Sequence, residues 1–219
     1  MLLWVLLTHH MWTPIPLTAG DQRLANWYLI NGIYIHFLMD GMVGCFHVWS
    51  LMDEQYKVLD GRFCTDGPCD RRLPNANAET VAAFKASGKP WPAPDSWVVP
   101  VLTGTAEYAI YAPMCLLVYL AIKTGKPWRR ALELILCTCH IYGTFVFMAG
   151  EEMTGGKNLW PGRGFSFDDL TYYWFGYLSA NLLWFFYPTY RIIQLLQETS
   201  AGLRGESVSV DGKKKGKVS

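Results

Sequence analysis

Four long apolar stretches run along the chain, and few charged residues interrupt them. They cover Leu24–Trp49, Val98–Ile122, Arg130–Gly150 and Leu170–Tyr190. A helix needs about 20 predominantly apolar residues to cross the hydrocarbon core of a bilayer. The chain has too little other sequence to cover four such helices on every side. The pattern therefore predicts an all-α fold, a polytopic membrane helix bundle with four full transmembrane helices.

A shorter apolar segment, Met1–Leu7, stands at the N-terminus. It is too short to span a membrane, and it lacks the basic start and the longer apolar core of a signal peptide. Its composition is typical of the end of a transmembrane helix. We therefore expect a truncated N-terminal helix beside the four full ones.

The orientation follows from the connection between the second and third apolar stretches. This connection, 123–130, carries four basic residues and no acidic one. Because Lys and Arg accumulate in short cytoplasmic loops, it is expected in the cytoplasm together with the C-terminus. The predicted domains are a transmembrane domain, 1–200, and a basic cytoplasmic tail, 201–219. Lys215 and Lys217 look like a dilysine retrieval signal of the endoplasmic reticulum, and a solvated basic tail is an equal alternative.

Composition agrees with a membrane protein. Of the 219 residues, 51% are hydrophobic and only 17% are charged, against about 25% charged residues in soluble domains. The formal net charge of +1 gives no basis for nucleic-acid binding. Cys64 and Cys69 lie in the predicted lumenal loop, where an oxidising compartment would allow a local disulfide. A lone pair at this spacing is weak evidence for a metal site. The other cysteines lie in apolar stretches as small hydrophobic residues: Cys45, Cys115, Cys137 and Cys139.

Every apolar stretch also contains polar or ionisable residues at similar depth. Such groups are costly inside a bilayer and mark functional sites by default. His36 and Asp40 are four residues apart on one helix face, and Glu107 lies near the middle of the second stretch. The third and fourth stretches add His140, Tyr142, Asn181 and Trp184. Since polar faces of a helix bundle turn inward, we expect these residues to face one another or a cavity.

Each of these residues also has a purely structural interpretation. For Asn181, a hydrogen bond to a neighbouring helix is an equal alternative. Trp184 could pack against the core or lipid, and His140 could be a hydrogen-bonded core histidine. The structural interpretation is weaker for Asp40 and Glu107, because a mid-membrane carboxylate without an obvious Lys or Arg partner is hard to justify otherwise.

The sequence argues against several kinds of catalytic site. Membrane di-iron enzymes need clustered histidines, whereas the five histidines here are few and scattered: His9, His10, His36, His47 and His140. The chain has no glycine-rich phosphate loop and no serine or cysteine nucleophile motif. We therefore expect no metal and no cofactor. Acid–base chemistry on an apolar molecule remains.

Three segments resemble blocks of the emopamil-binding protein family, whose shared domain is called EXPERA and which includes the sterol Δ8–Δ7 isomerases. The segment Gly32–Gly41 resembles the family's block with a His and an acid, here His36 and Asp40. The segment Ile141–Gly143, followed eight residues later by Glu151, resembles a second block. The segment Tyr172–Pro188 resembles the last helix of the family, with Asn181, Trp184 and Pro188 at the family spacing.

The chain departs from the family isomerases at two positions. They carry Glu where this chain has Asp40. They also carry a Glu nine residues before a helix proline, which would fall on Gly104, whereas Glu107 precedes Pro113 by six residues. The sigma-2 receptor branch of the same superfamily has the six-residue spacing. The resemblance therefore leaves the substrate open.

The resemblance implies a multi-pass, cofactor-independent double-bond isomerase of the endoplasmic reticulum membrane that acts on a sterol. An acid protonates a ring alkene, a tertiary carbocation forms, and a base removes a neighbouring proton. Glu107 and His36 are the expected proton-transfer pair, and Asp40 orients and charges His36. Trp184 stabilises the cation, and Asn181 holds Glu107 or a polar group of the ligand. Tyr111 and Tyr142 complete the expected substrate-binding set.

Two alternatives stay open. A terpenoid or meroterpenoid cyclase or isomerase of secondary metabolism would use the same protonation chemistry on another skeleton. A non-catalytic sterol- or amine-binding membrane protein, like the sigma-2 branch, would use the same cavity without turnover. The expected partners are a sterol or terpenoid substrate and membrane lipid, with a homodimer as one option for assembly. The sequence does not identify which residue donates the proton and which accepts it.

Overall fold

The structure is a computed structural model. It describes residues 14–63, 104–153, 155–156, 158–160, 162–204, 207–208 and 214–215. The expected N-terminal helix at Met1–Leu7, the pair Cys64 and Cys69, and the start of the second predicted span all lie outside the described residues.

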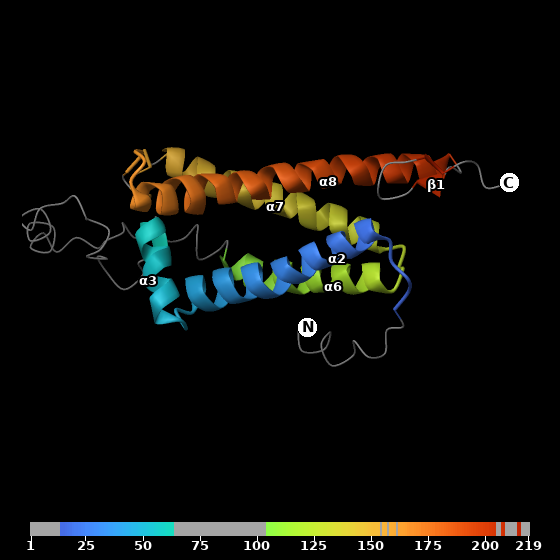
Figure 1. Ribbon diagram of the computed structural model, residues 1–219, viewed down its shortest axis with the longest axis horizontal. Coiled ribbons are helices and arrows are strands. Elements are labelled where there is room, and N and C mark those ends of the chain that lie inside the picture. Colours follow the sequence, from blue (N-terminus) through green and yellow to red (C-terminus); the bar gives the residue numbers. More distant parts are fainter. Residues whose placement is uncertain are drawn as a thin grey trace, which may run out of the picture.

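The first half of the described chain forms one long helix followed by a short one. Helix α2 (Ala19–Ile30) begins where the Thr18 side chain caps it, and it continues directly into η2 (Asn31–Cys45), which has wider turns. Helix α3 (Ser50–Leu59) is bent from this long helix by 86°. A three-residue helical turn, η3 (Gly61–Phe63), follows. Figure 1 shows α3 lying across one end of the bundle.

The second half supplies the remaining long helices. Gly104–Lys123 is one continuous helix that contains η5 (Glu107–Tyr111) and α6 (Ala112–Lys123). Helix α7 (Arg129–Met153) returns along it after a short turn. The last helix comprises η6 (Asp169–Ser179) and α8 (Ala180–Leu203). In Figure 1 the long helices run along the long axis of the molecule, with α2 and α6 on one side and α8 on the other.

The expected helical fold is confirmed for the described residues, whereas the expected number of spans is not. Beside the helices, the described residues hold one antiparallel pair of two-residue strands, β1 (Ser207–Val208) and β2 (Lys214–Lys215). Two helices are long and apolar enough to cross a membrane, Gly104–Lys123 and Arg129–Met153. The bent pair formed by α2–η2 and α3 would add a third. The fourth predicted stretch is helical but does not qualify, and it is rich in Tyr and Trp, residues that favour the membrane interface.

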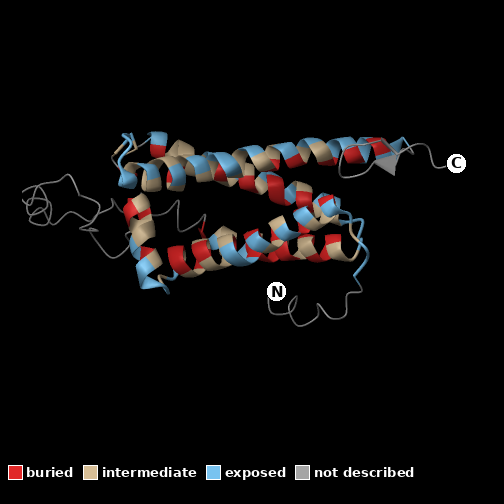
Figure 2. Ribbon diagram, viewed as in Figure 1, coloured by how far each residue is buried: buried red, intermediate tan, exposed pale blue. Residues whose placement is uncertain are grey.

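The surface and the core of the bundle differ from those of a soluble helical protein. Large apolar side chains are exposed along the outer faces of the long helices, among them Ile135, Phe145, Phe186 and Leu196. Figure 2 shows exposed positions repeating along the whole length of α8. Contiguous exposed apolar surface of this extent marks a face that contacts lipid or protein. The packed core lies between α2, α6 and α7, and it includes the buried cysteines Cys115 and Cys137.

A buried ion pair joins three of the long helices. The Arg191 guanidinium on α8 contacts Oε1 of Glu133 on α7 through Nη2, at 2.7 Å, and through Nε, at 2.8 Å. The Tyr28 hydroxyl on α2 donates to the same oxygen at 2.9 Å. Both charged side chains are almost completely buried, with exposures of 2% and 0%. The pair therefore holds α7 and α8 together at a point where neither charge can be solvated by water.

Removing the positive partner of this pair is expected to destabilise the fold strongly. Arg191→Met should lower the free energy of unfolding in detergent micelles by about 3–5 kcal/mol, because it leaves the Glu133 carboxylate buried and unpaired. Arg130→Met is the comparison variant on the same two helices. Arg130 pairs with Glu198, and because Arg130 is 46% exposed, water can reach this pair, so Arg130→Met should cost clearly less than Arg191→Met. Equal losses for the two variants in a denaturant titration would contradict this assignment.

Candidate active site

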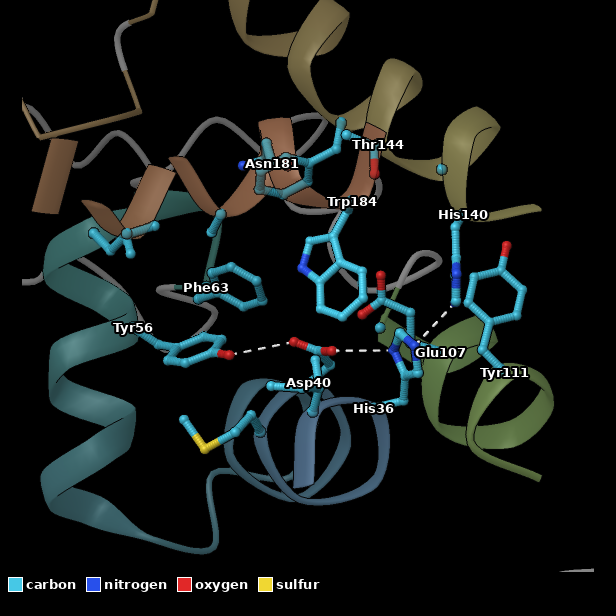
Figure 3. Close-up of a pocket in the computed structure, with 18 of the residues that line it drawn as sticks. His36, Asp40, Tyr56, Phe63, Glu107, Tyr111, His140, Thr144, Asn181 and Trp184 are labelled. Atoms are coloured by element: carbon cyan, nitrogen blue, oxygen red, sulfur yellow. Dashed lines mark hydrogen bonds and ion pairs between the residues drawn. The ribbon is translucent and has the colours of Figure 1, made fainter. Parts of the chain in front are cut away.

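A cavity of about 330 Å³ opens inside the bundle at the end covered by α3. Its walls come from η2, η5, α7, the junction of η6 and α8, and the segment α3–η3. Figure 3 shows the polar side chains of the cavity gathered around its centre. Such a cavity, mostly apolar with a few convergent polar groups, is the usual form of a binding site for a small apolar molecule.

The first pair of polar groups comes from one turn of η2. His36 and Asp40 are four residues apart, so their side chains lie on the same helix face. Nδ1 of His36 lies 3.4 Å from Oδ2 of Asp40. The Tyr56 hydroxyl on α3 donates to the other carboxylate oxygen, Oδ1, at 3.2 Å. Asp40 is therefore held between a histidine of its own helix and a tyrosine of the covering helix (Figure 3).

Glu107 reaches the same place from the facing helix. The ligand-forming atoms of His36, Asp40 and Glu107 all lie within 4.8 Å of one another. The side chains of Glu107 and Asp40 are close enough to share a hydrogen bond. A hydrogen bond between two carboxyl groups requires a proton on one of them. The pair can therefore hold a transferable proton beside an imidazole.

His140 on α7 completes a second contact of His36. The Nε2 atoms of the two histidines are 3.0 Å apart, and both side chains are buried. The Tyr111 ring packs edge-on against both imidazoles, at centroid distances of 5.9 and 5.4 Å. His140 was left without a chemical role by the sequence, because nothing in a helical pattern shows which residue of another helix it meets.

The residues expected on the last helix also line the cavity. The Trp184 ring lies 5.7 Å from the imidazoles of both His36 and His140. Asn181, one turn earlier, donates its Nδ2 to the carbonyl of Tyr177 at 2.7 Å. This bond fixes the amide, and Figure 3 shows Asn181 at the rim of the group around Trp184.

Tyr142 does not belong to this site. It is 69% exposed and does not line the cavity, in contrast to Tyr111. The physical reason is helical geometry: two residues on an α-helix are about 200° apart. Since His140 faces the cavity, Tyr142 faces outward. Thr144, one turn after His140, faces inward and is a lining residue that the sequence reasoning missed.

Helix α3 and η3 also contribute lining residues, and these lie outside the four predicted spans. Tyr56 and Leu59 on α3 and Phe63 on η3 all face the cavity. The sequence contains a signal for this helix, since its apolar and polar residues alternate as on an amphipathic helix. No local pattern, however, predicts the 86° bend that lays it over the end of the bundle.

A buried charge cluster ties this covering segment to α7. Arg62 Nη2 lies 2.6 Å from Oδ2 of Asp60, and Arg62 Nε lies 3.0 Å from Oε1 of Glu151. Asn158 donates to the same Glu151 oxygen at 2.8 Å. The Arg62 guanidinium also packs over the ring of Phe147, a cavity residue, at 4.2 Å. The cluster therefore anchors one wall of the cavity.

Two groups of side chains in the described residues are compact enough to consider as metal ligands. His36 belongs to both, once with Cys115 and His140 and once with Asp40 and Glu107. The histidine contact of 3.0 Å is a normal hydrogen-bond distance, and Asp40 and Glu107 can share a proton. A hydrogen bond between Nε2 of the two histidines therefore accounts for their close contact.

Fold and cavity together define a class: a bundle of helices, two or three of them apolar enough to cross a membrane, around an apolar cavity lined with carboxyl and imidazole groups. Comparison with known proteins agrees. The model of the family described as EXPERA (EXPanded EBP superfamily) matches residues 90–195. The chain is also 20% identical to the mouse (Mus musculus) 3-beta-hydroxysteroid-Delta(8),Delta(7)-isomerase over 187 residues, which cover 85% of this chain and 69% of that protein. The match to this family model and the similarity to the mouse isomerase both support the resemblance to the EXPERA family that the sequence indicated.

The charge cluster gives a prediction about the wall formed by α3. Arg62→Met leaves two buried carboxylates, Asp60 and Glu151, without their shared cation, which should cost about 3–5 kcal/mol. Hydrogen exchange of the amides in α3 should become faster, since local opening governs such exchange. Lys57→Met is the control, because Lys57 pairs with Asp53 within α3 itself and is partly exposed. Unchanged exchange in Arg62→Met would show that the cluster does not anchor the segment.

Proposed function

We propose that the protein is a sterol double-bond isomerase of the endoplasmic reticulum membrane, acting by protonation and deprotonation through a carbocation. The observation that supports this most is the meeting of Asp40, Glu107 and His36 in one apolar cavity. The family and the mouse relative, whose name states Δ8–Δ7 isomerase activity, support the substrate class. The low identity to that relative leaves sterol and terpenoid skeletons to be separated by experiment.

In this proposal the bundle crosses the membrane four times. The spans are α2–η2, Gly104–Lys123, α7 and η6–α8, with 123–130 and the tail from 201 in the cytoplasm. The buried pair of Arg191 and Glu133 then lies toward the cytoplasmic side, and α3 covers the lumenal side. A substrate that is itself a membrane lipid would enter from the bilayer, with its ring system in the cavity.

The first chemical step needs a proton donor in a cavity whose lining is mostly apolar. Glu107 fits this role, because its side chain lies beside Asp40 and can share a proton with it. Protonation of a ring alkene forms a C–H bond at one carbon and leaves a tertiary cation at the next. Loss of a proton from a neighbouring carbon restores a double bond at a new place, so the reaction is neutral in atoms and electrons.

The second step needs a base, and His36 is the candidate. Its Nδ1 faces the Asp40 carboxyl, which orients the imidazole and stabilises it when it gains a proton. The intermediate cation needs stabilisation that does not quench it, and an aromatic face supplies this through its quadrupole. Trp184, packed against both histidines, presents such a ring. Asn181 and Tyr111 complete the lining at the same level.

The space around the helix supports Glu107, and not position 104, as the place of the acid. Gly104, where the family spacing would place a glutamate, also lines the cavity. A Cβ atom added there would lie 2.4 Å from Sγ of Cys45, so a longer side chain does not fit without displacing that cysteine. Glu107, one turn further along, occupies a place where the cavity accommodates a carboxyl group. This supports Glu107 as the acid in this chain.

Replacement of Glu107 by glutamine is the direct test. Glu107→Gln retains shape and hydrogen bonding but has no transferable proton, so conversion of a Δ8-sterol should fall by about 10²–10⁴-fold. Protein level and sterol binding should change little. Asp40→Asn should lose less, because Asp40 acts through His36. Products are measured by lipid extraction and mass spectrometry.

Glu152→Gln is the matched control. It is the same substitution, made at an exposed position at the end of α7. It should convert sterol like the natural chain. Activity retained in Glu107→Gln would remove Glu107 from the mechanism. A natural chain that binds a Δ8-sterol but converts neither it nor a terpenoid alkene would instead be a binding protein.

A further inference from the structure

Both ring nitrogens of His36 lie near a polar atom, and Nε2 is the one that makes a hydrogen bond. Nδ1 faces Oδ2 of Asp40 at 3.4 Å, and Nε2 faces Nε2 of His140 at 3.0 Å. A neutral imidazole carries one N–H and one bare nitrogen, and the partner of one nitrogen determines the state of the other. The contacts on the two sides therefore decide which tautomer His36 adopts.

The Asp40 side determines the tautomer. The Tyr56 hydroxyl donates to Oδ1 of Asp40, so this carboxyl group acts as an acceptor toward α3. An acceptor at Oδ2 favours an N–H on the facing Nδ1 of His36. Nε2 of His36 is then bare and must accept a hydrogen bond. Since its neighbour at 3.0 Å is a second imidazole nitrogen, that nitrogen must carry the hydrogen.

We propose that His140 is a positioning residue that donates its Nε2–H to Nε2 of His36 and thereby holds His36 in the Nδ1–H form that faces Asp40. The four residues then make one chain of polar contacts across the cavity (Figure 3). His140 donates to His36, the Nδ1–H of His36 faces Asp40 at 3.4 Å, and Tyr56 donates to Asp40 from the far side. The chain crosses from α7 to α3, so it also links two walls of the cavity.

The surroundings keep the two imidazoles in this geometry. His36 and His140 are 3% and 6% exposed, and the rings of Tyr111 and Trp184 pack against both of them. A 180° turn of either ring would break the contact between the two Nε2 atoms. The titratable groups that face His36 come from every helix around it: Asp40, Tyr56, Glu107, Tyr111, Cys115 and His140.

The tautomer of His36 also affects the rate of turnover. The bare nitrogen of His36 is Nε2, so a proton taken from the substrate goes to Nε2 and replaces the hydrogen bond from His140 there. In the other tautomer the bare nitrogen would be Nδ1, which faces Asp40, and the wrong tautomer of a catalytic histidine is costly. His140 acts on the reaction only through His36. This effect on turnover rests on the proposed isomerase function, whereas the tautomer of His36 does not.

The tautomer is measured directly by ¹⁵N NMR of the full chain in micelles with ¹⁵N-labelled histidine, because a protonated and a bare ring nitrogen have distinct shifts. His36→Gln identifies the signals of His36. In the natural chain, His36 should show a protonated Nδ1 and a bare Nε2. His140 should show a protonated Nε2. A His36 signal with Nε2 protonated would overturn the proposal, whatever the activity of the protein.

Two variants of His140 separate donation from packing. His140→Leu retains bulk but removes the donor, so His36 should shift toward the other tautomer and turnover should fall by about 10- to 100-fold, the range for residues that orient a functional histidine. His140→Gln places an amide donor near the same point and should recover the tautomer and much of the turnover. Equal behaviour of the two variants in both measurements would contradict donation. A correct tautomer in a chain without isomerase activity would refute the proposed function alone.

Discussion

A polar group inside a bilayer must find its partner within the protein, because no water is available to it. This constraint explains where two buried arginines of the bundle lie. Arg191 on α8 meets Glu133 on α7 and the Tyr28 hydroxyl on α2. Arg62 meets Asp60 and Glu151 under the covering segment. The helices are thus held in register by a small number of specific contacts in addition to apolar packing.

The polar groups of the candidate site also have their partners within the protein, but these partners are not arginines. Here His36 shares a hydrogen bond with His140, and the carboxyl groups of Asp40 and Glu107 lie close to its ring. Among the described residues that line the cavity there is no Lys or Arg. A group of carboxyl and imidazole side chains without a fixed cation retains protons that can move. Trp184 and Tyr111 close the group with aromatic surface. The cavity therefore combines mobile protons with a face that can stabilise a positive charge, which is the combination that alkene isomerisation requires.

The sequence predicted what depends on local pattern. Helical spacing brought His36 and Asp40 to one face, and the depth of Glu107 and Asn181 predicted that they would face the same space, as their places around the cavity agree. It did not predict contacts that depend on how helices cross, such as the bond between His36 and His140 or the reach of Tyr56 from α3. Tyr142 was misplaced for a simpler reason, since its angular offset from His140 already pointed it outward. The fourth predicted stretch, Leu170–Tyr190, shows another limit of sequence patterns. Its aromatic residues suit both the membrane interface and the interior of a helix bundle, so they do not decide whether the stretch spans the membrane.

The central claim is that a double bond moves by addition of one proton and loss of another. Incubation of the purified chain with a Δ8-sterol in D₂O, followed by mass spectrometry and NMR of the product, tests this most directly. Protonation by a side chain that exchanges with solvent predicts one non-exchangeable deuterium at the carbon that becomes saturated, in every product molecule. A rearranged sterol without deuterium would mean that the same hydrogen migrates within the substrate, and it would contradict the account.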